Sequence, residues 1–178
     1  YFLERAAANY IEKTNVAITD ETAKNKIIKN LDSAINFEEL YEQVSTSNLY
    51  HKKRLMHYLS MILLRKTRNE TFYHQIKESV FDTALWNIDI INLAYIYLLD
   101  FITYKVKSGD DSYLHERHSV YKKIEHDSFA SGNVKIIYTF FRNFILSGIN
   151  TGDFRWSKYV LDKYIDVIEG KGNTGIKY

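Results

Sequence analysis

The sequence contains no cysteine and no proline. The missing cysteine excludes disulfides, thiolate zinc sites, iron–sulfur clusters and thiol nucleophiles, and it fits a cytoplasmic protein. Glycine is scarce as well: there are 7 in 178 residues, and the first of them is Gly109. More than half of the chain therefore lacks both of the residues that break helices most strongly, and this composition favours an all-α fold.

Catalytic motifs are also missing. The chain has no Gly-rich phosphate loop, no Gly-x-Ser-x-Gly elbow and no His-Glu-x-x-His pair. Asp110 and Asp111 precede a predicted helix, and we interpret them as a cap and a first-turn charge rather than an acid–base pair. The formal net charge of +2 is too small to indicate a polyanionic partner. The sequence accordingly predicts no enzyme activity, no catalytic residue, no cofactor and no metal.

What the chain does have is apolar residues at helical spacing. Phe72, Ile76 and Val80 recur at i, i+4 and i+8, while no window alternates between apolar and polar residues as a half-buried strand would. We therefore expect no strands. We predict about nine helices, stacked as antiparallel hairpins, over residues 1–15, 20–34, 37–45, 48–66, 70–82, 84–106, 111–127, 132–148 and 153–169. They are expected to form a single domain over residues 1–169, followed by a flexible tail at 170–178.

Residues that cap helix N-termini place the predicted helix starts. Asn36 followed by Glu39 has the spacing of a capping box, in which each side chain binds the backbone amide of the other residue. The other predicted caps are Asp20, Ser47, Asn69, Thr83, Asp111, Ser131 and Thr151.

The segment from Leu85 to Val106 is the most apolar of the chain. Asp89 and Asp100 interrupt it, and a charge near the middle of a membrane span costs at least about 2.5 kcal/mol. We therefore predict a buried central helix and no membrane span. The chain begins at Tyr1 rather than methionine, and its start lacks the pattern of a signal peptide. We expect it to be a piece of a longer protein.

The last predicted hairpin carries the most informative pattern. After a Gly-Asp-aromatic turn come a small residue and two large residues at helical spacing: Gly152, Asp153, Phe154, Ser157, Leu161 and Tyr164. Gly152 permits a tight reversal, and the small Ser157 lets two helices approach closely. Leu161 and Tyr164 are expected on the same face of the helix.

This pattern resembles the second half of a tetratricopeptide repeat and covers about 13 residues. The first half of the motif departs from the family, because Phe144, Ile145 and Gly148 stand where the family has a Leu-Gly pair and a Tyr. The resemblance implies a tetratricopeptide-like superhelix, an α-solenoid in which stacked hairpins leave a curved surface for a protein or peptide.

Histidine and tryptophan offer two further candidate groups. His115, His118 and His126 lie in one predicted helix, but a metal site needs three or four convergent ligands, so we interpret them as solvated or hydrogen-bonded. Trp86 and Trp156 stand near predicted helix starts, where we expect them to pack in the core.

Basic residues form the one candidate docking patch, which consists of Lys52, Lys53, Arg54, Arg65, Lys66 and Arg68. Nucleic-acid phosphates could bind such a patch. A solvated helix face, with cations favoured at its C-terminus by the helix dipole, is the alternative that we prefer.

The sequence favours a protein-interaction or scaffold module without catalytic activity. The alternative is a nucleic-acid-associated helical domain that uses the basic residues between Lys52 and Arg68. A third hypothesis is a helical hydrolase with a site between helices, which would need a pocket lined by histidines or carboxylates.

Overall fold

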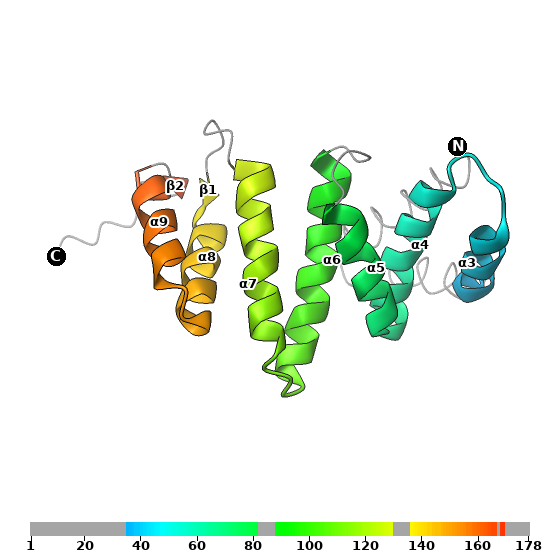
Figure 1. Cartoon of the computed structure of the whole chain (residues 1–178), viewed down its shortest axis with the longest axis horizontal. Coiled ribbons are helices and arrows are strands. Elements are labelled where there is room, and N and C mark those ends of the chain that lie inside the picture. The colour runs from blue at the N-terminus through cyan, green and yellow to red at the C-terminus, as the bar shows by residue number, and fades with distance from the viewer. Residues whose placement is uncertain (1–34, 82–87, 130–135, 167, 170–178) are drawn as a thin grey trace, which may run out of the picture. The chain divides into compact units, whose positions relative to one another are not determined.

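The computed structural model describes residues 35–81, 88–129, 136–166 and 168–169 (Figure 1). They fall into two structural units, which divide the chain into Tyr1–Leu85 and Trp86–Tyr178 and are treated separately. The predicted helices over residues 1–15 and 20–34, the predicted tail, Trp86 and the predicted caps Asp20, Thr83 and Ser131 lie outside the described residues. The single domain over residues 1–169 stays a prediction.

In the first unit three helices pack in the order of the sequence, namely α3 (Phe37–Thr46), α4 (Lys52–Thr67) and α5 (Glu70–Phe81). The central one is α4, because it packs against both α3 and α5. Every residue of α4 from His57 to Leu64 is buried. Side chains of α3 also reach α5: the Tyr41 hydroxyl donates to Gln75 Oε1 at 2.7 Å, and the Tyr41 ring meets Phe72 edge-on with centroids 5.2 Å apart.

The second unit contains four α-helices, namely α6 (Ile88–Lys107), α7 (Tyr113–Ile124), α8 (Tyr138–Thr151) and α9 (Phe154–Tyr164). Each packs against the next one along the chain, in the order that Figure 1 shows from green to orange. A π-helical turn, η3 (Glu125–Phe129), continues α7. Two strands of two residues each, β1 (Ile136–Ile137) and β2 (Ile168–Glu169), pair in parallel, with Ile136 opposite Ile168.

The all-α fold class is confirmed for the described residues. They contain seven α-helices, each of which overlaps a predicted helix. The expectation of no strands was wrong at β1 and β2, which the sequence had assigned to the ends of helices. Ile136, Ile137 and Ile168 are β-branched, and this favours extended pairing over helix where the chain offers a partner.

Two of the predicted caps are confirmed. Asn36 Oδ1 accepts from the Glu39 amide at 3.1 Å, and the Glu39 carboxylate accepts from Asn36 Nδ2 at 3.4 Å rather than from the backbone amide of the capping box. Asn69 Oδ1 accepts at 2.9 Å from the amide of Thr71, the second residue of α5. Both helices therefore begin where local side-chain chemistry places them.

The predicted caps Ser47 and Thr151 were wrong, because both residues end a helix instead. The Ser47 hydroxyl donates to the Val44 carbonyl at 2.8 Å, and the Thr151 hydroxyl donates to the Ser147 carbonyl at 3.0 Å. A hydroxyl can bind a carbonyl of the preceding turn as readily as an amide of the following one. Asp111 does not start a helix either, since α7 begins at Tyr113.

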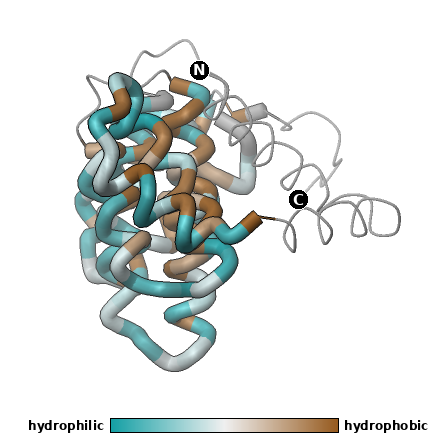
Figure 2. The backbone as a smooth tube through the Cα atoms, turned by 90° about the vertical axis from the view of Figure 1, so that its right-hand side faces the viewer, coloured by the Kyte–Doolittle hydropathy of each residue, from teal (hydrophilic) through white to brown (hydrophobic). Residues whose placement is uncertain are grey.

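The most apolar helix, α6, is buried on one side only. Ala94, Leu98 and Ile102 are fully buried, whereas Ile96 keeps 56% and Tyr104 46% of its surface exposed. The prediction of a buried central helix was therefore wrong for the outer side of α6. None of the helices in the described ranges combines the length and the apolar composition that crossing a bilayer requires. Figure 2 shows hydrophilic and hydrophobic residues interleaved along the helices.

Helices α8 and α9 are in close contact at Gly148. A Cβ atom there would lie 2.2 Å from Ser157 Oγ and 2.9 Å from the carbonyl oxygen of Asp153. Ser157 Oγ donates to the Ile145 carbonyl at 3.1 Å across the same contact. Gly152, with φ at +78°, turns the chain between the two helices. The expected roles of Gly152 and Ser157 are confirmed.

We predict that Gly148→Ala destabilises the chain by about 1–3 kcal/mol, the usual cost of overpacking, even though alanine is the better helix former by about 1 kcal/mol. The Ser157 side chain can turn away from the added methyl group, but the Asp153 carbonyl belongs to the backbone. Asn150→Ala, on the exposed side of α8, is the matched control and should change stability by less than about 0.5 kcal/mol. Urea unfolding measures both variants, and a Gly148→Ala variant as stable as the wild type would contradict the close approach.

Candidate interaction surface

The six residues of the predicted docking patch lie at the two ends of α4. Three begin α4 and three follow near its end, namely Lys52, Lys53 and Arg54, and Arg65, Lys66 and Arg68. With a rise of about 1.5 Å per residue, Arg54 and Arg65 are about 16 Å apart along the helix axis. Lys52 Nζ donates to the Ser45 carbonyl at the end of α3, and Lys66 Nζ lies 4.8 Å from the centroid of the Phe37 ring. Nucleic-acid docking by these residues stays a prediction.

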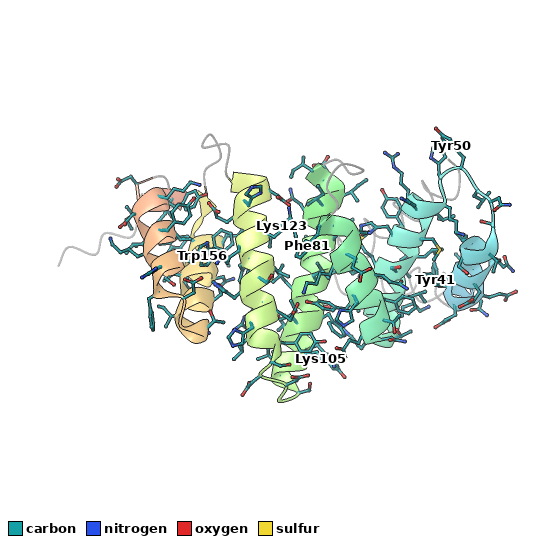
Figure 3. All side chains as sticks on the ribbon, viewed as in Figure 1. Tyr41, Tyr50, Phe81, Lys105, Lys123 and Trp156 are labelled. Atoms are coloured by element: carbon teal, nitrogen blue, oxygen red, sulfur yellow. The ribbon has the colours of Figure 1, made fainter. Side chains whose placement is uncertain are left out.

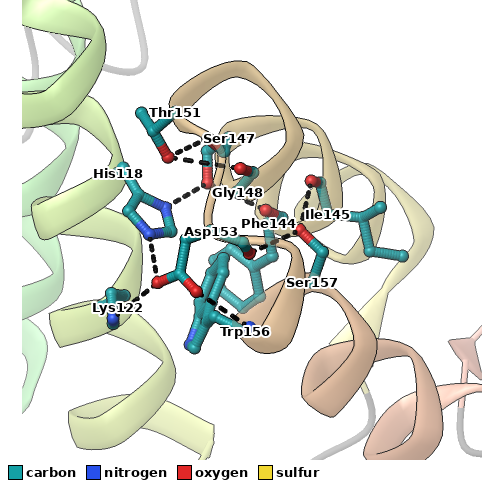
Figure 4. Close-up of polar contacts among 10 residues, drawn as sticks. All are labelled: His118, Lys122, Phe144, Ile145, Ser147, Gly148, Thr151, Asp153, Trp156 and Ser157. Atoms are coloured by element: carbon teal, nitrogen blue, oxygen red, sulfur yellow. Dashed lines mark hydrogen bonds and ion pairs between the residues drawn. The ribbon is translucent and has the colours of Figure 1, made fainter.

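Of the three histidines considered as metal ligands, His118 is buried, and His115 and His126 are exposed. His118 Nδ1 lies 3.1 Å from Ser147 Oγ in α8, and Nε2 lies 3.1 Å from Asp153 Oδ2 before α9 (Figure 4). His118 is therefore hydrogen-bonded, as predicted, and it ties α7 to both following helices. Within the described ranges, no three His, Asp or Glu residues are grouped as a metal ion would require.

Trp156 completes this junction from α9. Its ring stands edge-on to His118, with centroids 4.8 Å apart, and lies 5.8 Å from the ring centroid of Phe144. Figure 3 shows the indole among the side chains of α8 and α9. Only 8% of Trp156 is exposed, so its predicted place in the core is confirmed.

Ser147, His118 and Asp153 are the residue types of a serine-hydrolase triad, but their geometry is that of an interhelical clamp. The Ser147 hydroxyl donates to the Phe144 carbonyl at 2.8 Å, so its proton is already engaged. Ser147 is also buried, with 2% of its surface exposed, whereas a nucleophile must reach its substrate. The three side chains hold α7, α8 and α9 together.

The Asp153 carboxylate carries the charge of this junction. Oδ1 accepts from the Trp156 amide at 3.1 Å and so caps α9, while Oδ2 accepts from Lys122 Nζ at 3.0 Å. Hydrogen bonds from Lys122 and His118, together with the Trp156 amide, lower the pKa of Asp153 from 3.8 to about 2. The carboxylate is thus favoured as an anion in the folded chain.

We predict a stability loss in acid that Asp153→Asn removes. Because the folded-state pKa of Asp153 is depressed, its contribution is complete above its unfolded value of 3.8 and is lost as the pH falls toward about 2. Asparagine keeps the cap but has no charge to titrate. Unfolding free energies from urea titrations should therefore converge for wild type and Asp153→Asn between about pH 5 and pH 2. Parallel curves over this range would contradict the charged role of Asp153.

The π-helical turn η3 directs a second carboxylate toward α9. Glu125 is buried, and its Oε1 accepts from Tyr164 at 2.6 Å, Lys163 Nζ at 2.8 Å and Tyr159 at 3.2 Å. Burial raises the pKa of Glu125, but the three donors outweigh it, so the pKa lies below its ordinary value. Burial, followed by the Glu125 carboxylate, raises the pKa of Tyr164 to about 12. This cluster fixes the side of α9 that faces η3.

Asp127, two residues after Glu125 in η3, binds residues of α6 and α7 instead of α9. Its Oδ2 accepts from the Tyr95 hydroxyl of α6 at 2.5 Å, and its Oδ1 accepts from Lys123 Nζ at 2.8 Å. Burial and the Asp127 carboxylate raise the pKa of Tyr95. The sequence alone indicates neither carboxylate of η3 as a bridge between helices, since their partners in α6 and α9 lie 32 to 39 residues away in the chain.

The two tyrosines on Glu125 allow a matched comparison. We predict that Tyr164→Phe destabilises the chain by about 1.5–3 kcal/mol, because it removes a short, buried hydrogen bond to a charged group. Tyr159→Phe removes a longer bond from a half-exposed side chain, and should cost less than about 1 kcal/mol. Thermal or urea unfolding ranks the pair, and equal losses would contradict the assigned difference in burial.

The first unit contains a similar His–Ser contact. His57 in α4 is buried, and its Nδ1 lies 2.6 Å from Ser79 Oγ in α5, whose hydroxyl also reaches the Ile76 carbonyl at 3.1 Å. Burial lowers the pKa of His57 from 6.5 to about 4. At neutral pH this histidine is uncharged, and it serves packing between two helices.

The outer surface of the last hairpin is apolar. Its exposed side chains are Tyr138, Leu146 and Ile149 of α8 and Phe154 and Leu161 of α9, with 42–65% of their surface exposed. We call these five residues the α8–α9 face. Leu161 was expected on the face of Tyr164, but Tyr164 is buried with Trp156 and Val160 at i, i+4 and i+8, which leaves Leu161 outside. Exposed apolar patches mark interaction sites in many proteins, so this face is the candidate interaction surface.

Comparison with known proteins gives this chain no relative. No family model, no curated protein and no solved structure matches it. The tetratricopeptide resemblance stays a prediction that rests on the residues of the last hairpin.

Proposed function

We propose that this chain is a protein-interaction or scaffold module built from helix hairpins, and that the α8–α9 face is the surface with which it binds another polypeptide. The observation that carries the proposal is the concentration of exposed apolar side chains there. Of the thirteen large hydrophobic residues exposed in the described ranges, six lie on α8 and α9. Five of these six residues form the α8–α9 face, and the sixth is Tyr159.

Charge is sparse on the same surface. Arg142 is the one charged residue among the 14 residues of α8. With so little charge, the outer side of α8 is poorly suited to face water along its whole length. Protein interfaces have such a centre, poor in charge and rich in aromatic and aliphatic side chains.

The surface is held rigidly from behind. Contact at Gly148 brings α9 against α8, Asp153 fixes the start of α9, and Glu125 fixes its far side. A rigid surface loses little conformational freedom when it binds, so more of its contact energy appears as affinity. The polar clusters that could suggest catalysis are thus assigned to supporting the interaction surface.

The packing order supports the hairpin architecture that the proposal assumes. In each unit the extensive contacts join helices that are consecutive in the sequence. Second neighbours meet through individual side chains, as Tyr41 does with Phe72 and His118 with Trp156. Tetratricopeptide-like solenoids pack in this way, with each repeat contacting its neighbours along the chain.

We predict that a photo-crosslinking phenylalanine analogue at position 154 forms adducts with a polypeptide in the native cells, whereas the same analogue at Tyr50 does not. Both positions hold exposed aromatic residues, with 65% and 95% of their surface exposed, so accessibility alone would favour Tyr50. Adducts are detected by their mass after denaturing electrophoresis. Absence of adducts at position 154, or equal adducts at both positions, would overturn the proposed function.

A further inference from the structure

We propose that the α8–α9 face binds the same face of a second copy of this chain, with the two α9 helices antiparallel across a two-fold axis. This inference rests on the proposed function and names the polypeptide that is bound. It follows from the order of apolar and charged residues along the outer side of α9.

One stripe of α9 is apolar. Phe154, Leu161 and Ile165 have the spacing i, i+7 and i+11, which places them on one side of a helix. Phe154 and Leu161 are exposed, and Ile165 keeps helical backbone angles as the residue that ends α9. The stripe borders α8, because Ser157, which contacts α8, lies one turn from both Phe154 and Leu161. It is therefore continuous with Ile149 of α8.

A second stripe of α9, beside the apolar one, is charged, and its sign reverses halfway. Arg155 and Lys158 lie in the first half, and Asp162 and Asp166 follow in the second. All four side chains are exposed. Lys158 Nζ already lies 2.8 Å from Asp162 Oδ2 within the helix, at the point where the sign changes.

The order of charges along this stripe is complementary to the same stripe running in the opposite direction. When two α9 helices run antiparallel about a two-fold axis, the charged stripe of one meets the charged stripe of the other on the same side, in opposite direction. Cations of the first half then face anions of the second half, whereas a parallel two-fold pair would place the two charged stripes on opposite sides of the contact. The antiparallel pairing brings together Arg155 with Asp166, Lys158 with Asp162, and Phe154 with Ile165.

The face can be changed without disturbing the fold. The residues that bury α9 against the rest of its unit are Trp156, Ser157, Val160 and Tyr164. The charged stripe and the apolar stripe lie outside this set, and substitutions at such surface positions are usually within about 0.5 kcal/mol of neutral. Variants of the outer side therefore report on association rather than on folding.

The test uses complementary charge reversal. The purified chain should form a dimer in sedimentation equilibrium. The variant Arg155→Glu with Lys158→Glu makes the charged stripe acidic throughout, and Asp162→Lys with Asp166→Lys makes it basic throughout. Each variant alone should dissociate at least about 30-fold more readily, and an equimolar mixture should recover a heterodimer with near wild-type affinity. Phe154→Ser should weaken the dimer as well, while Tyr50→Ser, an exposed position of the first unit, should not. Circular dichroism verifies that every variant is folded.

Three results would overturn the second copy as partner: a wild-type chain that is monomeric up to about millimolar concentration, a dimer indifferent to the changes on α9, or variants that fail to associate when mixed. Crosslinking at position 154 separates this failure from that of the proposed function. Adducts with a different protein would leave the interaction surface in place and remove only the self-association.

Discussion

The placement of α9 depends on one carboxylate. Asp153 accepts from the Trp156 amide with one oxygen and from His118 and Lys122 of α7 with the other. A helix cap sets where a helix begins, but it leaves the direction of the helix free. The bonds to α7 restrict that freedom, so the same side chain sets the start of α9 and ties it to α7, while Gly148 and Glu125 complete its orientation. The α8–α9 face exists because this orientation is fixed.

Buried histidine–serine contacts recur between neighbouring helices in both units. In each, the serine hydroxyl reaches the carbonyl three residues earlier in its own helix and meets a histidine of the preceding helix. A buried polar group is costly unless it is hydrogen-bonded, so each contact favours one register of the two helices over others. The difference lies in the surroundings: burial lowers the pKa of His57, whereas His118 contacts the Asp153 carboxylate.

The sequence predicted what depends on neighbours in the chain. Helical periodicity and missing helix breakers gave seven helices of the described residues, and Asn36, Asn69 and Gly152 act locally as expected. It failed where two local outcomes are equally good, as for the hydroxyls of Ser47 and Thr151. The contacts of Glu125 and Asp127 could not be predicted, because they depend on which helices become neighbours in the folded chain. The basic residues of α4 are near in sequence and divide between the two ends of the helix.

The α8–α9 face could not be predicted from the sequence for a related reason. From the sequence alone, Leu161 is expected in the core, because leucine is usually buried. The buried residues Trp156, Val160 and Tyr164 show which side of α9 faces inward. Four inward positions at helical spacing, with Tyr159 and Lys163 bound to Glu125, leave five residues of the eleven-residue helix outward. The contacts that stabilise the fold do not determine which residue types lie on that outward side. If a second copy binds this side, the apolar residues and the charge order follow from what the outer side of α9 meets rather than from how α9 is held.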